Sequence, residues 1–418
     1  MGAKRSSTTG WVVTLVGILA AVMIAINMFK VPPTMGLLME DLGIGPALGG
    51  WLMTVPTITG LILALPSGSL TDKFGPKKVG LFAIVSAVVG SLMGAFMPTI
   101  ELLLVSRFIE GLSFALIGVA VPALISMWFS PEKSGMPMAI WSGWVPIGML
   151  AIFTGANFFI AADDPGTWTN VWWLSTALLV VAAVLFFIFV KAPEGYAPED
   201  APKVSIIEGM KSPATWLLAV IFAMFAFIMY AVSTFAPTYC MQELGFSIED
   251  SNLYSSLITV GMILGVVIMS PVLNKVVKLK SRLWLLVVSM ILTALIAILA
   301  FNVPPSMTVA VMLITGIVLQ LVPAVVWPIG PVAAVAPMYI GTTFGVIALG
   351  RSIGGFGNAS IGTLIETSGW GAAIMVLVGI GVIGVVACLA LFKFMKEDPA
   401  EAATDAPQTE AGAAASDK

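Results

Sequence analysis

Twelve apolar stretches, each about 20 residues long, constrain this chain more than any other feature of its sequence. In lipid every backbone polar group must bond internally, so helices and closed barrels are the structures that can span a membrane. Only 10% of the 418 residues are charged, against about 25% in a typical soluble domain. We therefore expect an all-α membrane protein with twelve transmembrane helices. Their approximate limits are 11–38, 47–67, 79–97, 100–127, 138–160, 170–190, 216–241, 252–273, 283–301, 307–330, 342–365 and 370–392.

Basic residues are confined to one side of these stretches. With the N-terminus placed in the cytoplasm, 16 of the 19 Lys and Arg residues fall in cytoplasmic segments. The loops on the opposite side contain acidic residues but no Lys or Arg. Because positive charge is retained on the cytoplasmic side, we expect both termini in the cytoplasm. The chain is then a multi-pass protein of a bacterial-type cytoplasmic (inner) membrane.

The longest internal loop divides the spans six and six. This loop, 191–215, carries mixed charge and Pro, and we interpret it as a cytoplasmic linker between six-helix bundles at 1–190 and 216–396. The tail at 397–418 is Ala-rich and acidic without an apolar face, which predicts disorder.

The two halves also repeat each other at an offset of 202 residues. Asp41-Leu42-Gly43 falls on Glu243-Leu244-Gly245, and Lys73 falls on Lys275. Such internal repetition is typical of transporter folds.

The loop after the second span reads G-S-L-T-D-K-F-G-P-K-K. It resembles the characteristic G-x-L-a-D-r-x-G-r-k loop of the major facilitator superfamily. The matching residues are Gly68, Leu70, Asp72, Gly75, Lys77 and Lys78. The fourth span adds R-F-I-E-G, similar to the family's R-x-x-x-G pattern. The resemblance covers residues 11 to about 393 and implies two six-helix bundles that work by alternating access.

For this loop we expect glycines that permit a tight turn at a helix end. The basic pair Lys77 and Lys78 can sit among the last helix carbonyls or lipid phosphates. An ordinary positive-inside loop is the alternative. We assign a gating or conformational role to Gly68, Asp72, Gly75, Lys77, Lys78, Arg107 and Glu110.

Three basic residues lie within predicted spans, namely Lys30, Arg107 and Arg351, and Glu110 is the one acid deep in a span. Arg107 and Glu110 are three apart on one helix, where side chains can pair, either for function or for structure alone. Lys30 and Arg351 have no acidic partner that the sequence reveals. Charges inside a membrane normally face a partner or a wet cavity, so these two cations, one from each half, predict an anion site. Snorkelling to the outer interface is the alternative for Lys30.

Several further residues are candidates to line that site. The glycine-rich run 350–362 around Arg351 permits close helix packing, or it exposes Ser352 and Asn358 as hydrogen-bonding groups. Trp144 falls on Gly350 at a second repeat offset of 206, which places it beside Arg351. Tyr230 is a polar aromatic residue of span seven. The expected substrate-binding set is Arg351, Lys30, Trp144, Asn358, Tyr230 and Ser352.

Three branches of the superfamily share features with this chain. The G-G-F-G-N run resembles the glycine signature of nitrate and nitrite porters, although the cavity arginines of that family are absent from spans two and eight. The N-terminal half looks like the cyanate branch, and a single basic residue in span eleven is similar to the oxalate and formate exchangers. All three imply a small anion.

We therefore expect a secondary active transporter of a carboxylate-like or inorganic monoanion, as an exchanger or a proton-coupled symporter. With no His and with Glu110 as the one buried acid, the chain has few internal proton carriers. The alternative is an exporter of lipophilic or drug-like molecules that uses the Met- and Trp-rich apolar walls.

The composition also excludes other classes of protein. A chain without His cannot form a zinc-His site or a His-based triad, so we expect no enzyme. We also expect no cofactor, no metal site and no nucleic-acid partner. The expected partners are the anion, protons and membrane lipids, around a monomeric protein.

Overall fold

The computed structural model of the chain describes residues 7–64, 66–96, 99–129, 137, 140–141, 143–191, 206–276, 278–336 and 339–395. These residues form an all-α protein in which one isolated bridge pairs Ala161 with Asp164. Within them, 10 helices are long and apolar enough to cross a membrane, and Trp144–Phe158 is a shorter apolar helix. The expected all-α membrane class is confirmed. The linker residues 192–205 and the tail 397–418 lie outside the described part.

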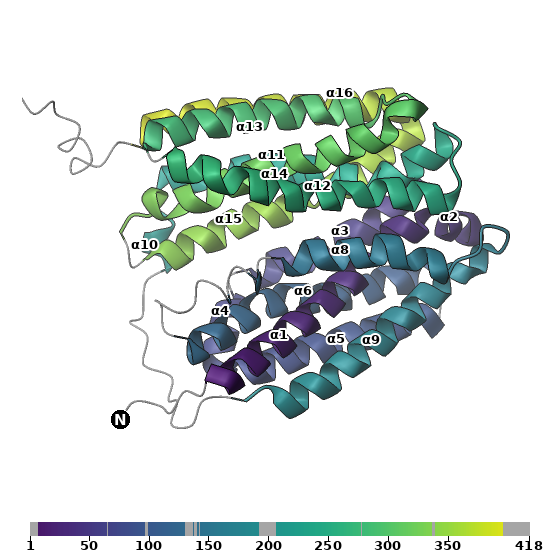
Figure 1. Cartoon of the computed structure of the whole chain (residues 1–418), viewed down its shortest axis with the longest axis horizontal. Helices are drawn as coiled ribbons and strands as arrows, with labels where there is room; N and C mark the ends of the chain where they lie inside the picture. Colours follow the sequence, from purple (N-terminus) through teal and green to yellow (C-terminus); the bar gives the residue numbers. More distant parts are fainter. Residues whose placement is uncertain are drawn as a thin grey trace, which may run out of the picture.

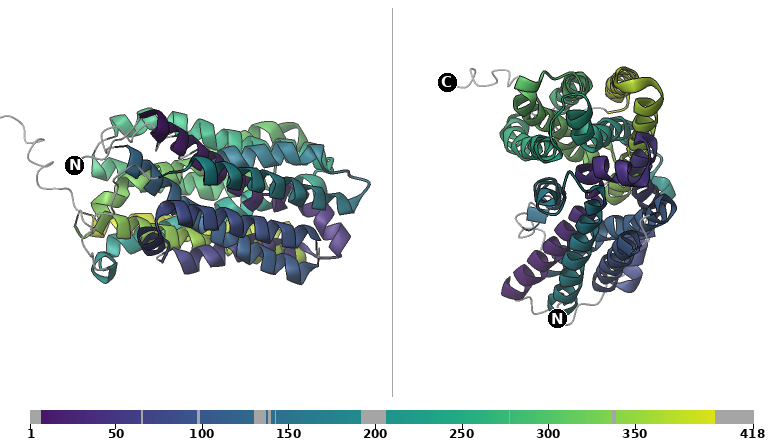
Figure 2. Two further views of the ribbon diagram at one scale, coloured as in Figure 1. Left: turned by 90° about the horizontal axis from the view of Figure 1, so that it is seen from below. Right: turned by 90° about the vertical axis from the view of Figure 1, so that its right-hand side faces the viewer.

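The helices form two groups that lie side by side (Figures 1 and 2). The N-terminal group contains α1 Ser7–Met28, α2 Val31–Leu42, α3 Pro46–Leu63, α4 Pro66–Phe74, α5 Pro76–Phe96, α6 Ile100–Trp128, α8 Trp144–Gly155 and α9 Trp168–Phe189. The C-terminal group contains α10 Ile206–Gly209, α11 Pro213–Gln242, α12 Ile248–Lys275, α13 Leu279–Ala300, α14 Thr308–Ala333, α15 Ile340–Gly354 and α16 Gly357–Phe394. We refer to these groups as the N-terminal and C-terminal halves.

The two ends of the molecule differ in charge. Helix α1 begins and α16 ends at the end that carries α4 and α10, on the left in Figure 1, and we name it the α4 end. The opposite end, where α2 finishes, is the α2 end. The described basic residues at the α4 end are Lys73, Lys77, Lys78, Lys191, Lys211, Lys275, Lys278, Lys280, Arg282 and Lys393. Acidic residues such as Glu40, Asp41 and Glu243 occupy the α2 end, where the described residues include no Lys or Arg.

The first expected span is two helices instead of one. Helix α1 ends at Met28 and α2 begins at Val31, so the chain breaks at Phe29 and Lys30. Pro32 and Pro33 lack the N–H groups that would bond to the carbonyls of Met28 and Phe29. These two prolines therefore interrupt the helical ladder at this point, deep in the buried core.

Span eleven is also broken into two helices. Helix α15 ends at Gly354 and α16 begins at Gly357, directly after Arg351 and Ser352. Helix α16 then continues past Gly369, whose φ of 77° marks a kink inside it. The expected boundary between spans eleven and twelve falls at this kink. A glycine tolerates the left-handed conformation that the turn requires.

The loop motif after the second span proves to be mostly helical. Gly75 has a φ of 83° and ends α4, so the expected glycine turn is confirmed there. For Gly68 that expectation is wrong, since Gly68 lies inside α4, where the sequence continues the helix up to Phe74. Lys77 Nζ donates to the carbonyl of Phe187 in the last turn of α9, at 3.1 Å, as expected of the basic pair. Lys78 is exposed, and the side chain of Asp72 lies outside the described part of the structure.

The two halves are bonded together toward the α2 end. Ala47 N–H donates to Glu366 Oε2 (3.0 Å), Asn157 Nδ2 donates to the carbonyl of Glu249 (3.0 Å), and Asn252 Nδ2 donates to the carbonyl of Pro33 (2.9 Å). Closer to the middle, the Thr54 hydroxyl donates to the carbonyl of Gly355 at 3.1 Å. The described residues therefore close the molecule at the α2 end.

Candidate functional site

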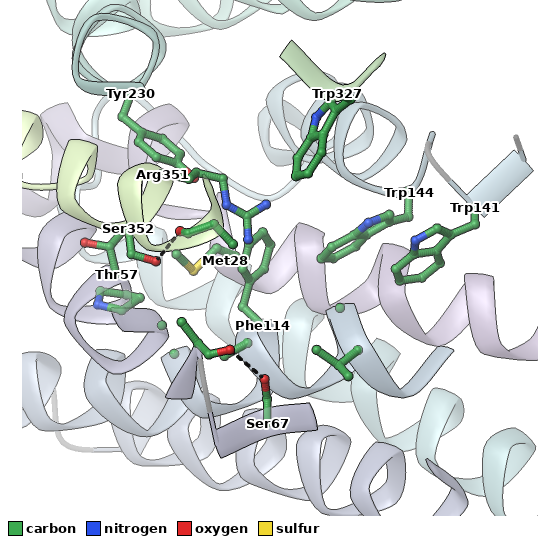
Figure 3. A pocket seen from close by; sticks show the side chains of 18 residues that line it. Met28, Thr57, Ser67, Phe114, Trp141, Trp144, Tyr230, Trp327, Arg351 and Ser352 are labelled. Atoms are coloured by element: carbon green, nitrogen blue, oxygen red, sulfur yellow. Dashed lines mark hydrogen bonds between the residues drawn. The ribbon is translucent and has the colours of Figure 1, made fainter. Parts of the chain in front are cut away.

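A pocket of about 300 Å³ lies between the two halves, on the α4 side of these bonds (Figure 3). It begins beside the breaks in spans one and eleven, where Met28 and Arg351 line it, and extends to Ala64, Ser67 and Gly118 nearer the α4 end. Both halves contribute to its wall. Its five aromatic residues are Phe114, Trp141, Trp144, Tyr230 and Trp327.

Among the residues that the structure describes, Arg351 is the one charged residue that lines this pocket. It lies in the last turn of α15, three residues before the helix ends, and its side chain is partly exposed. Within the described chain its guanidinium has no ion pair or hydrogen bond. Figure 3 shows it among Tyr230, Trp327 and Met28. Among these residues Arg351 thus has no acidic partner.

The polar groups of the pocket are mostly unused donors. The indole N–H groups of Trp141, Trp144 and Trp327 and the hydroxyl of Tyr230 have no hydrogen-bond partner among the residues that the structure describes. By contrast, Ser352 Oγ donates to the carbonyl of Ala348 (3.3 Å), as Figure 3 shows. A pocket with a guanidinium and free N–H groups favours ligands that only accept, as carboxylate and nitrate do.

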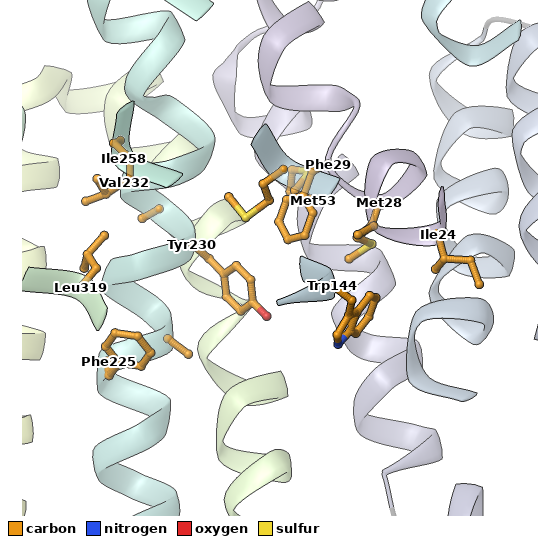
Figure 4. Packing of buried hydrophobic residues seen from close by; sticks show 14 of the residues in the cluster. Ile24, Met28, Phe29, Met53, Trp144, Phe225, Tyr230, Val232, Ile258 and Leu319 are labelled. Atoms are coloured by element: carbon orange, nitrogen blue, oxygen red, sulfur yellow. The ribbon is translucent and has the colours of Figure 1, made fainter. Parts of the chain in front are cut away.

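Aromatic rings form the two walls of the pocket. On the N-terminal side Trp141 stacks on Trp144 with ring centroids 5.2 Å apart and an interplanar angle of 16°. Phe114 lies 4.9 Å from Trp144. On the C-terminal side Trp327 is held between Phe222 and Phe344, at 5.5 and 5.4 Å. Figure 4 shows Tyr230 pointing from α11 toward the side of Met28 and Trp144.

Lys30 does not line the pocket, and the expectation that it lacks an acidic partner is wrong. Its Nζ donates to Glu110 Oε1 at 2.7 Å, and also to Asn27 Oδ1 (2.8 Å) and Ser91 Oγ (2.9 Å). Its side chain is completely buried, with Nζ 4.3 Å above the ring of Trp172, so it does not snorkel either. The partner was missed because Glu110 belongs to α6 and reaches Lys30 across 80 positions of sequence.

The expected pairing of Arg107 with Glu110 is confirmed, and the pair is equally buried. Arg107 also donates to three backbone carbonyls, those of Asn27 (3.2 Å), Met28 (2.7 Å) and Leu52 (2.9 Å). Two of these carbonyls belong to the end of α1, where the helix leaves them without intrahelical partners. Lys30, Arg107 and Glu110, which we name the buried triad, therefore stabilise the break in span one.

Asn358 is also placed away from the pocket. Its side chain is fully buried, accepts from the Thr234 hydroxyl (2.7 Å) and donates to the carbonyl of Gly355 (3.1 Å). Of the six residues that we expected to bind substrate, the structure brings four together at the pocket, namely Arg351, Trp144, Tyr230 and Ser352.

The expected substrate-binding set lacks three of the aromatic wall residues, Phe114, Trp141 and Trp327. For Phe114 and Trp141, the signal that could have found them is helical spacing. Trp141 precedes Trp144 by three positions, and Phe114 follows Glu110 by four on α6.

Comparisons with known proteins agree on the family and the fold. A family model described as Major Facilitator Superfamily matches residues 13–357. A Bacillus subtilis (strain 168) protein named "Putative niacin/nicotinamide transporter NiaP" is 24% identical over 81% of this chain and 84% of its own length. A Mycobacterium tuberculosis (strain ATCC 25618 / H37Rv) protein named "Probable nitrate/nitrite transporter NarK2" is 23% identical over 56% of this chain, which spans 58% of that relative. The crystal structure of a D-xylose-proton symporter superposes with a TM-score of 0.75 at 16% identity, over 93% of this chain and 98% of that one.

Proposed function

The chain belongs to the Major Facilitator Superfamily, and from this premise we propose that it is a secondary active transporter of a small anion, working by alternating access. That it is a transporter and not an enzyme follows from its relatives and structural neighbours. The observation that carries the anion assignment is the guanidinium of Arg351, which is unpaired among the described residues and stands between the two halves. Relatives named for nitrate/nitrite and for niacin/nicotinamide support a small substrate, and of these four compounds nicotinamide alone is uncharged.

The proposed topology has twelve spans and both termini in the cytoplasm of a bacterial-type inner membrane. The kink at Gly369 separates spans eleven and twelve, and the short helix Trp144–Phe158 belongs to span five. Bundles at 1–190 and 216–396 then form the two moving halves. The concentration of Lys and Arg at the α4 end supports this orientation. In this orientation the pocket, which extends toward the α4 end, faces the cytoplasm.

For energy coupling we propose anion exchange, or symport in which the proton travels with the substrate. Glu110 is held between two buried cations and does not line the pocket. In this arrangement it is poorly placed to carry a proton alone. This placement of Glu110 supports transport without a dedicated carboxylate relay.

The decisive experiment measures anion binding and exchange with purified full-length protein in proteoliposomes. Removing one partner of a desolvated charge-assisted contact costs about 2 to 5 kcal/mol, roughly 30-fold to several thousandfold in affinity. We expect Arg351→Gln to lose anion binding by this factor. Arg351→Lys should recover little of it, because an ammonium lacks the planar fork of a guanidinium. The matched control is Arg282→Gln, since Arg282 lies at the start of α13 outside the pocket.

The aromatic walls favour a second candidate, an exporter of lipophilic molecules. That candidate predicts binding of lipophilic cations that Arg351→Gln leaves unchanged or improves. Anion binding that survives Arg351→Gln would contradict our proposal.

A further inference from the structure

We infer that the substrate is a planar aromatic monocarboxylate, whose carboxylate pairs with Arg351 and whose ring packs against the aromatic walls. The inference deepens the proposed function and rests on it. It names which small anion the pocket fits, which neither the family nor the charge of Arg351 decides alone.

The first step is the charge of the pocket. In the described part of the chain Arg351 is its one charged lining residue, because Lys30 is paired with Glu110 inside the N-terminal half. A monoanion therefore leaves the bound pocket neutral. A dianion such as oxalate would bring a second negative charge to a place with no cation to meet it, and burying an unpaired charge is strongly unfavourable. The pocket thus selects one negative charge.

The second step is the chemistry of the walls. Five aromatic side chains line a cavity of about 300 Å³, which lies at the small end of ligand pockets. Nitrate or formate alone would leave these ring faces in contact with water. A single-ring acid would cover them and gain both apolar burial and ring–ring contacts. Trp144 and Trp327 line the cavity from opposite halves, so a flat ring bound between the halves has an indole on each side.

The third step is selection against uncharged analogues. An amide in place of the carboxylate would leave the Arg351 guanidinium without an anion after water has been displaced. The amide offers one acceptor oxygen instead of two, so its NH2 group faces a donor of the guanidinium and the two-bond pair is lost. The aromatic amide should therefore bind much more weakly than the acid, although the two have nearly the same shape.

The test compares binding of four probes to the purified full-length protein by calorimetry. Benzoate is the aromatic acid, cyclohexanecarboxylate its non-planar counterpart, benzamide its uncharged counterpart and oxalate the small dianion. We expect benzoate to bind about two- to tenfold more tightly than cyclohexanecarboxylate, and at least about tenfold more tightly than benzamide and oxalate. Equal affinity for benzoate and cyclohexanecarboxylate, or tighter binding of oxalate, would overturn the inference.

Two wall variants and one matched control assign the preference to the pocket. Trp144→Leu and Trp327→Leu should reduce the preference for benzoate over acetate to less than about threefold, while the affinity for acetate changes little. Trp284→Leu is the control, because Trp284 is exposed on α13 and packs against Phe392 outside the pocket. Thermal unfolding of each variant confirms that it is folded.

Failure of this inference is distinguishable from failure of the proposed function. If nitrate or acetate binds in an Arg351-dependent manner and benzoate has no advantage, the substrate class is wrong and the anion transporter stands. If no anion binds in an Arg351-dependent manner, both are wrong.

Discussion

At the residue scale, Glu110 is the residue on which the buried triad depends. It pairs with both Lys30 and Arg107, one through each carboxylate oxygen, and all three side chains are inaccessible to solvent. Glu110→Gln leaves two buried cations without an anion, which we expect to destabilise the protein by about 3 to 5 kcal/mol. Lys30→Met leaves the pair of Arg107 and Glu110 intact and should cost less. Thermal unfolding in detergent measures both, and equal stability of Glu110→Gln and the unmodified protein would contradict the role of the triad.

Two hydroxyl groups of the pocket should differ in their effect on binding. The Ser352 hydroxyl is already bonded to the carbonyl of Ala348, whereas the Tyr230 hydroxyl has no partner among the described residues. We expect Tyr230→Phe to weaken anion binding about fivefold, the value of one hydrogen bond of about 1 kcal/mol. Ser352→Ala should leave the dissociation constant nearly unchanged. Titration with the same anion in both variants checks the difference, and a larger loss in Ser352→Ala would reverse the assignment.

The sequence identified residues of the pocket better than it identified their partners. Arg351 could be singled out because a cation deep in an apolar stretch is rare and needs an explanation. The ion-pair partner of Lys30 could not be predicted in the same way. Its carboxylate partner comes from α6 and meets it only because span one breaks at Lys30. Pairing between distant helices depends on packing, which a single helix pattern does not encode.

At the scale of elements, the break in span eleven is closed by a side chain from the other half. The Thr54 hydroxyl donates to the carbonyl of Gly355 and accepts from the N–H of Ala359 (3.0 Å). Thr54→Val keeps the shape but leaves the N–H of Ala359 without its acceptor, at about 1 to 3 kcal/mol, whereas the carbonyl of Gly355 keeps its bond from Asn358. We expect this penalty to weaken the closed α2 end and to increase hydrogen–deuterium exchange in α3 and in residues 357–368.

Thr59→Val is the matched control for that prediction. It lies on the same helix, but its hydroxyl bonds to the carbonyl of Phe108 within the N-terminal half, at 2.9 Å. It should therefore leave exchange in residues 357–368 unchanged. Equal exchange in the two variants would mean that the Thr54 contact does not hold the halves together.

The two glycines of the α4 region should respond oppositely to alanine. Gly75 has a positive φ, so Gly75→Ala should cost about 1 to 2 kcal/mol of stability. Gly68 lies inside α4 with open space around an added Cβ, and Gly68→Ala should gain about 0.5 to 1 kcal/mol. Thermal unfolding of both variants gives the signs. Destabilisation by Gly68→Ala would indicate that Gly68 is needed for a state other than the one described.

The loop motif shows what a sequence pattern can and cannot predict about a single helix or turn. Its spacing predicted a turn, and the turn lies at Gly75, but the pattern could not tell that residues 66–74 continue as a helix. Breaks inside apolar stretches were likewise invisible to hydropathy. Hydropathy gives the length of an apolar stretch, whereas the positions of the helix breaks depend on Pro32, Pro33 and the glycines near Arg351.

At the scale of the whole molecule, the apolar pattern was sufficient to predict the class of fold. The conformational state could be learned from the structure alone. Every hydrogen bond between the halves among the described residues lies toward the α2 end, while the pocket extends toward the α4 end. The alternating access that we propose requires a second state, open at the α2 end. Side chains that line the pocket should therefore be reachable from one face of the membrane at a time.

The last prediction tests this one-sided access with cysteine labelling. Gly118→Cys places a thiol in the pocket, where an added Cβ meets nothing within 4 Å. Ala162→Cys places one at the exposed α2 end. The native Cys240 and Cys388 are buried, which keeps the background low. With the α4 end in the cytoplasm, a membrane-impermeant maleimide should label Gly118→Cys in inverted vesicles and Ala162→Cys in right-side-out vesicles. Benzoate should protect the first thiol and leave the second unaffected. Labelling of both thiols from the same face would contradict the closed α2 end. The face from which Ala162→Cys is labelled shows which side of the membrane the α2 end occupies.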